Sequence, residues 1–143
     1  MRARKLIISS TVLIGSAALV GAYCDSFATV EQEFKTSAVV FVGKVSSARE
    51  VSVQSQAVSG GTFYSVAVEQ VLKGTPSKTV ELYSENSSGR FPMRVDVQYL
   101  VFAGYGVFEG ISGQRLAINN CGNSAPLSKA HKALATVRKL TKV

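Results

Sequence analysis

The chain of 143 residues contains no tryptophan, one histidine and only two aspartates. The histidine, His131, stands among lysines near the C-terminus and has no second ligand at a zinc-binding spacing. Asp25 and Asp96 form no carboxylate pair, and the usual metalloprotease, serine-hydrolase and phosphate-loop motifs do not occur. These absences lead us to expect a protein that is not an enzyme and that uses no metal and no cofactor.

Proline and charge are also sparse, with three prolines and 17% charged residues, whereas 46% of the residues are hydrophobic. This composition differs from that of disordered chains, which have few apolar residues and many charges. A chain of this length can form one domain with a modest core. We therefore expect a single folded domain.

Residues 1–22 have the layout of a secretory signal peptide. Three basic residues at the start precede an uncharged, mostly apolar run over residues 6–20, and small residues lead to an expected cut after Ala22. The apolar run of about 15 residues is shorter than the roughly 20 that span a bilayer. We predict a cleaved signal and an exported protein, periplasmic or extracellular, with a retained membrane anchor as the alternative.

Export leaves residues 23–143, which carry a formal charge of +4. Besides a cleaved signal and a retained anchor, a third interpretation is a lipoprotein, because Cys24 lies close behind the apolar run. Tyr23, however, is too bulky for the small residue that precedes a lipidated cysteine. A charge of +4 supports weak attraction to anionic surfaces and does not by itself indicate nucleic-acid binding.

Cys24 and Cys121 are the only cysteines. An even number of cysteines in an exported chain favours a disulfide, and two free thiols are the alternative. The bond would close a loop of roughly 100 residues, for which the chain-entropy model gives about 4.7 kcal/mol as an upper value.

The strongest strand signal is Ser37–Val45, SAVVFVGKV, whose apolar side chains cannot all lie on one face of a sheet. We therefore predict a central strand, about Val39–Ser47 with a continuation toward Val53, that is covered on both faces. Thr62–Leu72 alternates as a strand does, and a turn follows at Lys73–Pro76. Further strands are predicted at Lys78–Ser84, Val95–Gly104 and Arg115–Asn119, with loops at Gln54–Gly61 and Glu85–Pro92. About five turn-bounded strands indicate a small all-β barrel or sandwich.

Two helices flank the predicted strands. In Asp25–Lys35, Phe27 and Phe34 share one helical face, so we expect a short helix, or an irregular turn, that packs both rings on the strands. Asp25 or Ser26 is expected as its N-cap. A second helix is predicted at Leu127–Leu140, with Pro126 in its first position and Ser124 as cap.

The apolar stripe of the C-terminal helix leaves its lysines and arginine on other faces. Their ordinary interpretation is a solvated helix surface. A contact with anionic surfaces through Lys132, Arg138 and Lys139 is the alternative. The tyrosines and phenylalanines of the strands are read as core residues rather than as a platform for single-stranded nucleic acid, so no nucleic-acid partner is expected. These aromatic residues are Tyr64, Tyr83, Tyr99 and Phe102.

Four segments in a fixed order carry a resemblance to a known family. They are VFVGKV at Val40–Val45, YSVAVEQVLKG at Tyr64–Gly74, YLVFAG at Tyr99–Gly104, and NNCGNSAPL around Cys121. In this order and spacing they resemble the netrin-like domain family, the OB-fold shared with tissue inhibitors of metalloproteinases, and especially its short secreted bacterial members. The resemblance covers the chain from Cys24 to about Leu127.

The resemblance implies a mainly β protein, a five-stranded OB-fold barrel with flanking helices. It also implies a binding or inhibitory module whose partner is a protein. In the metalloproteinase inhibitors an N-terminal cysteine places its α-amine and carbonyl on the zinc of the target, and Cys24 is the only position that could do so here. Tyr23 would block that amine after the expected cut, and Ser87-Ser88-Gly89 stands where the family often has a further cysteine before glycine.

The leading hypothesis is thus a non-enzymatic module that binds a protein partner. Its alternatives are a metalloproteinase inhibitor that acts through the region of Cys24, and a binder of anionic envelope polymers. The oligomeric state is not predicted. The candidate partner-binding residues are Tyr23, Cys24, Lys132, Arg138 and Lys139.

Overall fold

The computed structural model describes residue 24 and residues 26–52 and 59–142. The predicted signal peptide, Tyr23 and most of the loop predicted at Gln54–Gly61 lie outside the described residues. The elements in chain order are α1 (Val30–Thr36), β1 (Val39–Ser52), β2 (Ser59–Lys73), β3 (Thr79–Glu85), β4 (Gln98–Val107), β5 (Gln114–Ala117), β6 (Ala125–Pro126), the 3₁₀ turn η1 (Leu127–Lys129) and α2 (His131–Leu140). Over these residues the protein is mainly β, as expected, with two α-helices.

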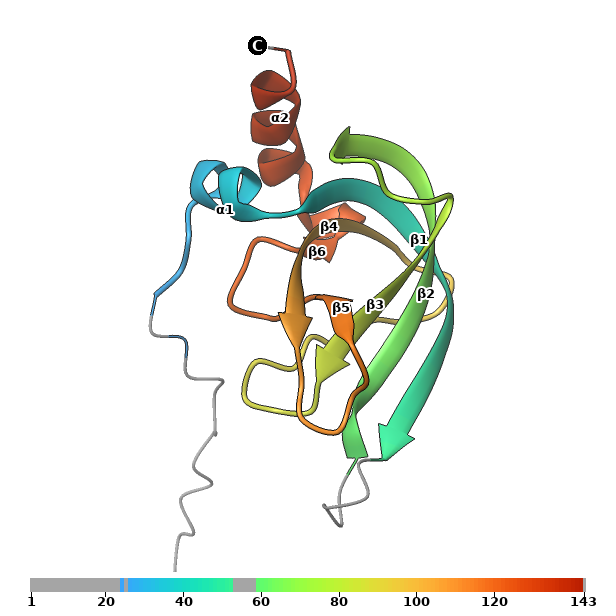
Figure 1. The fold of residues 1–143 in the computed structure, drawn as a ribbon. Helices are drawn as coiled ribbons and strands as arrows, with labels where there is room; N and C mark the ends of the chain where they lie inside the picture. Colours follow the sequence, from blue (N-terminus) through green and yellow to red (C-terminus); the bar gives the residue numbers. More distant parts are fainter. Residues whose placement is uncertain (1–23, 25, 53–58, 143) are drawn as a thin grey trace, which may run out of the picture.

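Five strands form a ring (Figure 1). β1 pairs antiparallel with β2 on one side and with β4 on the other, while β2 pairs with β3 and β4 with β5. The ring closes between β3 and β5 through one parallel pair, Tyr83 and Ala117. Both helices lie on one side of this ring, and the far end of the β1–β2 hairpin extends away from them.

β1 is the central strand that the sequence predicted, because its two faces enter two different cores. Phe41 and Val45 point into the inner core, which lies within the ring and draws on β1 to β4. Val40 and Val42 point into the outer core, between the strands and the helices. All four side chains are buried. The aromatic side chains predicted as core residues, Tyr64, Tyr83, Tyr99 and Phe102, are buried as well.

Helix α1 begins later than predicted. Thr29 is its N-cap, since its Oγ1 accepts a hydrogen bond from Gln32 N at 3.2 Å and Gln32 Oε1 accepts one from Thr29 N at 2.9 Å. This capping box fixes the start of the helix at Val30 and makes the prediction of Asp25 or Ser26 as cap wrong. Phe34 packs against the outer core as expected, but Phe27 precedes the helix and is 74% exposed.

The C-terminal helix also starts later than predicted. Ser124 does not cap it, because its Oγ accepts a hydrogen bond from Phe102 N at 2.8 Å and donates one to Phe102 O at 3.3 Å. Pro126 belongs to β6, where it lies opposite Tyr99. The turn η1 follows, and α2 begins at His131. The predicted apolar stripe is confirmed, because Ala130, Leu134 and Val137 are buried and Leu127 packs against the same outer core.

Two strand boundaries differ from the prediction for local backbone reasons. Asp96 has a φ of 65°, so it ends a turn and the strand β4 starts after it, at Gln98. Gly60 and Gly61 belong to the first residues of β2, which begins at Ser59, whereas the prediction placed both in a loop. A Cβ on Gly61 would lie 2.6 Å from Tyr83 Oη, so only glycine leaves room for the Tyr83 ring at this point.

Candidate functional site

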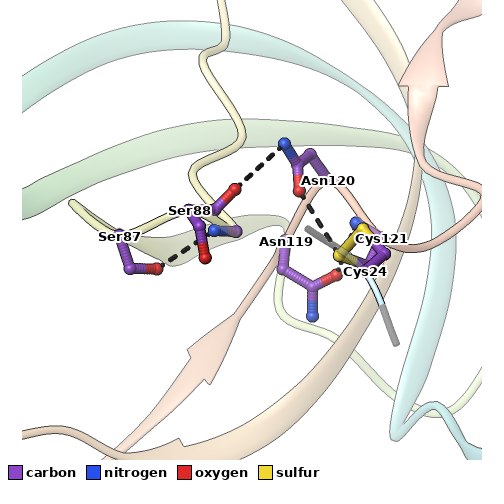
Figure 2. Close-up of a disulfide and its surroundings, with 7 residues drawn as sticks. Cys24, Ser87, Ser88, Asn119, Asn120 and Cys121 are labelled. Atoms are coloured by element: carbon purple, nitrogen blue, oxygen red, sulfur yellow. Dashed lines mark hydrogen bonds between the residues drawn. A yellow bond between two sulfur atoms is a disulfide. The ribbon is translucent and has the colours of Figure 1, made fainter. Parts of the chain in front are cut away.

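A disulfide joins the first described residue to the loop after β5 (Figure 2). Cys24 and Cys121 are 97 residues apart in sequence, with an S–S distance of 2.01 Å and a Cα–Cα distance of 5.6 Å. The predicted pairing is confirmed. Its presence is compatible with the predicted export, because disulfides persist in oxidising compartments.

The loop at Ser87–Gly89 lies beside the disulfide (Figure 2). Asn120 links the two segments, because its backbone N–H donates to Gly89 O at 3.0 Å and its side-chain amide lies 3.5 Å from Ser88 O. Asn119 Oδ1 accepts a hydrogen bond from Cys121 N at 3.0 Å. Hydrogen bonds therefore hold the Ser87-Ser88-Gly89 segment, where the family that the chain resembles often has a cysteine.

Two shallow hollows flank Cys121. The larger, of about 470 Å³, lies toward Glu85 and Phe108, and the smaller, of about 310 Å³, lies toward Ser26 and Glu33. Both hollows share a floor of small or short side chains: Gly104, Ala117, Asn119 and Cys121. We name the disulfide, these hollows and the segments 26–28, 87–89 and 119–122 the disulfide edge. Its surface combines backbone groups and polar side chains with apolar ones, such as the exposed Phe27 and, in the larger hollow, Phe108.

Glu33 and Asn123 hold α1 against the disulfide edge, a contact that no sequence pattern predicted. The Glu33 carboxylate accepts hydrogen bonds from the backbone N–H of Asn123 and from its side-chain amide, the latter at 2.7 Å. The same amide donates to Ala28 O at 3.0 Å. The two residues are 90 positions apart, so only the folded chain brings them together.

The exposed side of α2 forms a basic face. Lys132 and Lys139 are exposed, and the two ion pairs found within the described ranges, Lys44–Asp96 and Arg49–Glu81, involve neither of them. Arg138 is exposed but donates to Gln70 Oε1 on β2 at 3.2 Å. Of the three basic residues predicted for partner contacts, two are thus unpaired. No residue of α2 lines either hollow beside Cys121, so we treat the disulfide edge and the basic face as two surfaces.

A third feature, which the sequence did not indicate, lies on the outer side of β2 and β3. The rings of Phe63, Tyr83 and Phe108 pack together, with centroid distances of 4.9 Å and 4.7 Å to Tyr83. The Tyr83 hydroxyl donates to Gly60 O. Burial, and to a smaller extent the charge of Glu85, raises the pKa of Tyr83 above its usual value of about 10.

His131, the single histidine of the chain, is exposed at the start of α2. Over residues 24, 26–52 and 59–142, no three His, Cys, Asp or Glu side chains are close enough together to hold a metal ion. Within the same residues, no helix has the length and apolar character needed to cross a membrane.

The described residues form a small β domain in which a disulfide joins the segment before α1 to the loop after β5. A scan against protein-family models matches none of them, and a search of curated proteins finds no match. The family that the sequence motifs resemble therefore remains a proposal.

Proposed function

We propose that the protein is an exported, non-enzymatic binding module of the netrin-like OB type that binds a protein partner at its disulfide edge. The five-stranded ring with two helices supports this assignment, because it has the strand number and flanking helices that the resemblance implies. The segments that carry the resemblance lie in β1, β2, β4 and the loop of Cys121.

The observation that carries the proposal is the position of the disulfide. It fixes the start of the domain next to two open hollows, so this surface is ordered before any partner arrives. Pre-ordering lowers the entropy cost of association. Phe27, which is 74% exposed and lies next to the smaller hollow, provides an apolar anchor of the kind that dominates binding energies at interfaces.

A photo-crosslinking amino acid at position 27 tests the proposal in the secreted, disulfide-bonded protein. We expect one discrete crosslinked protein from this position, and its loss when both Cys24 and Cys121 are replaced by serine. A crosslinker at Glu50, which is exposed on β1, is the matched control. Equal crosslinking from positions 27 and 50 would refute the assignment of the disulfide edge.

Inhibition of a metalloproteinase is a narrower form of the same proposal. It requires a free α-amine on Cys24, because only an unacylated amine can coordinate the zinc of the target. Intact-mass and peptide-mass spectra of the exported protein, with and without reductant, identify the first residue. A chain that starts at Tyr23 and contains the intact disulfide removes zinc chelation by Cys24, whereas a chain that starts at Cys24 supports it.

Binding of anionic envelope polymers is the second candidate function, and the basic face of α2 favours it. The helix contains no acidic residue, and Lys132 and Lys139 are exposed without an acidic partner within the described part of the chain. Double charge reversal, Lys132→Glu with Lys139→Glu, should lower the salt concentration that elutes the protein from a sulfated-polysaccharide column. Lys78→Glu, an exposed lysine before β3, is the control. Equal elution of the double variant and the wild type would exclude this function.

A further inference from the structure

A hollow of about 580 Å³ lies between the segment before β4 and the turn η1. Its basic side chains are Arg94, from the segment before β4, and Lys129, from η1. We name it the basic hollow. It shares no lining residue with the two hollows beside Cys121, and no residue of α2 lines it. Its volume falls within the range of about 300–1,000 Å³ that is usual for small-molecule sites.

The charge of the basic hollow distinguishes it from four other hollows on the described surface. No acidic residue lines it, whereas each of the other four contains one carboxylate: Glu85, Glu81, Glu33 and Asp96. Arg94 and Lys129 are exposed, and neither belongs to an ion pair within the described ranges. Asp96, which is close to Arg94 in sequence, pairs instead with Lys44 at 3.3 Å. The charge that complements this hollow is therefore negative.

Tyr99 of β4 provides a third polar group in the lining. The residue is 2% exposed, and its hydroxyl oxygen accepts a hydrogen bond from the backbone N–H of Arg94 at 2.9 Å. Among the described residues the hydroxyl has no acceptor for its own proton. A buried hydroxyl normally donates as well as accepts, so this proton remains available to an oxygen atom at the base of the hollow.

Backbone hydrogen bonds fix both walls of the basic hollow. On one side, Val97 N–H donates to Arg94 O at 3.3 Å, and Asp96 N–H donates to Val45 O on β1 at 2.9 Å. On the other side, Ala130 N–H donates to Leu127 O at 3.2 Å and closes η1. The backbone positions from which the two basic side chains extend are thus set before any ligand arrives, which lowers the cost of binding.

We propose that the basic hollow binds a small organic anion, which is an oxyanion carried on a compact apolar body. The guanidinium group of Arg94 offers a planar pair of donors that fits a carboxylate or a phosphate, and Lys129 adds a second positive charge. The apolar part of the lining, which would contact the body of the ligand, consists of Pro92, Val97 and Pro126. An apolar lining with a few polar groups is typical of small-molecule sites.

The backbone amide of Arg94 reports on this site, because it donates to the hydroxyl of Tyr99. We titrate sodium benzoate as the probe into the secreted, disulfide-bonded protein and record amide spectra. Benzamide, which has the same shape without the charge, and sodium acetate, which has the charge without the ring, are compared at equal ionic strength. The Arg94 amide should shift saturably with benzoate, and benzoate should bind about tenfold more tightly than benzamide, because hydrogen bonds to a charged group are the stronger ones.

Two variants and a matched control sharpen the titration. Arg94→Gln and Lys129→Gln each remove one charge from an exposed side chain and should weaken benzoate binding about threefold to tenfold. Arg90→Gln removes the same charge from an exposed arginine outside the hollow and should leave binding unchanged. Equal binding by all three variants, or equal binding of benzoate and benzamide, would overturn the site.

The remaining probes test the two parts of the ligand. Acetate that binds as tightly as benzoate would overturn the apolar body. Phenyl phosphate, titrated in the same way, distinguishes the two oxyanions: the tighter of benzoate and phenyl phosphate identifies the group that the hollow prefers, and saturable binding of neither would overturn the proposal. Because the hollow shares no residue with the disulfide edge, this result does not depend on the proposed function of that edge.

Discussion

The two faces of β1 show two different ways of making a core. On one face, Phe41 and Val45 enter the inner core, which is made mostly by strands of the ring and is completed by Phe91 and Met93 from the segment before β4. On the other face, Val40 and Val42 enter the outer core, which is complete only when α1 and α2 lie on the strands. The inner core therefore depends on strand pairing, whereas the outer core depends on the positions of two short helices near the ends of the chain.

Ties between distant residues position these helices. The disulfide and the Glu33–Asn123 hydrogen bonds join the region of α1 to the loop after β5. Lys73, at the end of β2, binds the C-terminal carbonyls of α1. The disulfide edge is built around the disulfide and the Glu33–Asn123 hydrogen bonds, and the basic face lies on α2. Both candidate binding surfaces therefore depend on the packing of the helices on the outer core more than on the pairing of the strands in the ring. The following predictions test this difference.

Phe41→Ala in the inner core should have the largest effect. The side chain is completely buried, and its removal should lower the free energy of unfolding by about 3–5 kcal/mol, because the cavity cannot collapse within a closed ring. Urea denaturation followed by circular dichroism measures the change. The matched variant in the outer core is Leu134→Ala, which is 8% exposed on a surface helix and should lower the free energy by about 2–3 kcal/mol. An equal or larger loss for Leu134→Ala would contradict the comparison.

Joint replacement of Cys24 and Cys121 by serine should have the second-largest effect, about 2–4 kcal/mol. We expect the loss of stability to affect the helices more than the strands, because the disulfide joins the segment before α1 to the loop after β5 and no cysteine lies in a strand of the ring. In hydrogen exchange under native conditions, the amides of α1 should exchange much faster while those that pair β1 with β2 remain the slowest. Uniform acceleration in helices and strands would show that the ring also needs the disulfide.

The sequence was informative where the determinants are local. The apolar run at Val39–Val45 and the alternation after Thr62 predicted β1 and β2, because a strand buried on both faces and one buried on a single face differ in residue pattern. The predicted starts of both helices were wrong, because several residues near each start could act as the N-cap and the sequence pattern did not show which one does. Thr29 and Gln32 form a capping box downstream of the predicted caps Asp25 and Ser26, and the hydroxyl of Ser124 binds the backbone of Phe102 instead of a helix terminus.

The candidate sites were predictable only in part. The number of cysteines and the export signal predicted the disulfide, since two cysteines leave one pairing. Glu33 and Asn123 meet across 90 residues, and Arg115 of β5 lies over the ring of Phe63 on β2. No local sequence pattern could predict these contacts, because the order of the strands in the folded ring brings the residues together.

Lys73→Met should weaken the tie between α1 and the ring. Lys73 Nζ donates to the carbonyls of Phe34, Lys35 and Ser37 at 2.6–2.8 Å, and methionine keeps the apolar stem without the donors. We expect a loss of about 1.5–3 kcal/mol, the range for hydrogen bonds of a charged group. Lys78→Met, an exposed lysine in the next loop, is the control and should change stability little. Thermal unfolding of both variants measures the effect, and similar values would argue against the tie.

Tyr83→Phe should have the smallest effect at neutral pH and a distinct effect at high pH. The variant loses the hydrogen bond to Gly60 O, which contributes about 1 kcal/mol, and keeps the ring contacts with Phe63 and Phe108. The pKa of Tyr83 is raised in the folded protein, so above pH 10 the unfolded chain releases this proton while the folded chain retains it. The contribution of this proton is fully present below pH 10 and is lost as the pH rises toward the folded pKa. Urea unfolding at pH 8 and at pH 10.5 should therefore show a larger loss of stability with pH for the wild type than for Tyr83→Phe. Equal losses would mean that Tyr83 ionises as readily in the folded protein as in the unfolded chain, and that the aromatic cluster around Tyr83 is less protected from water than its burial indicates.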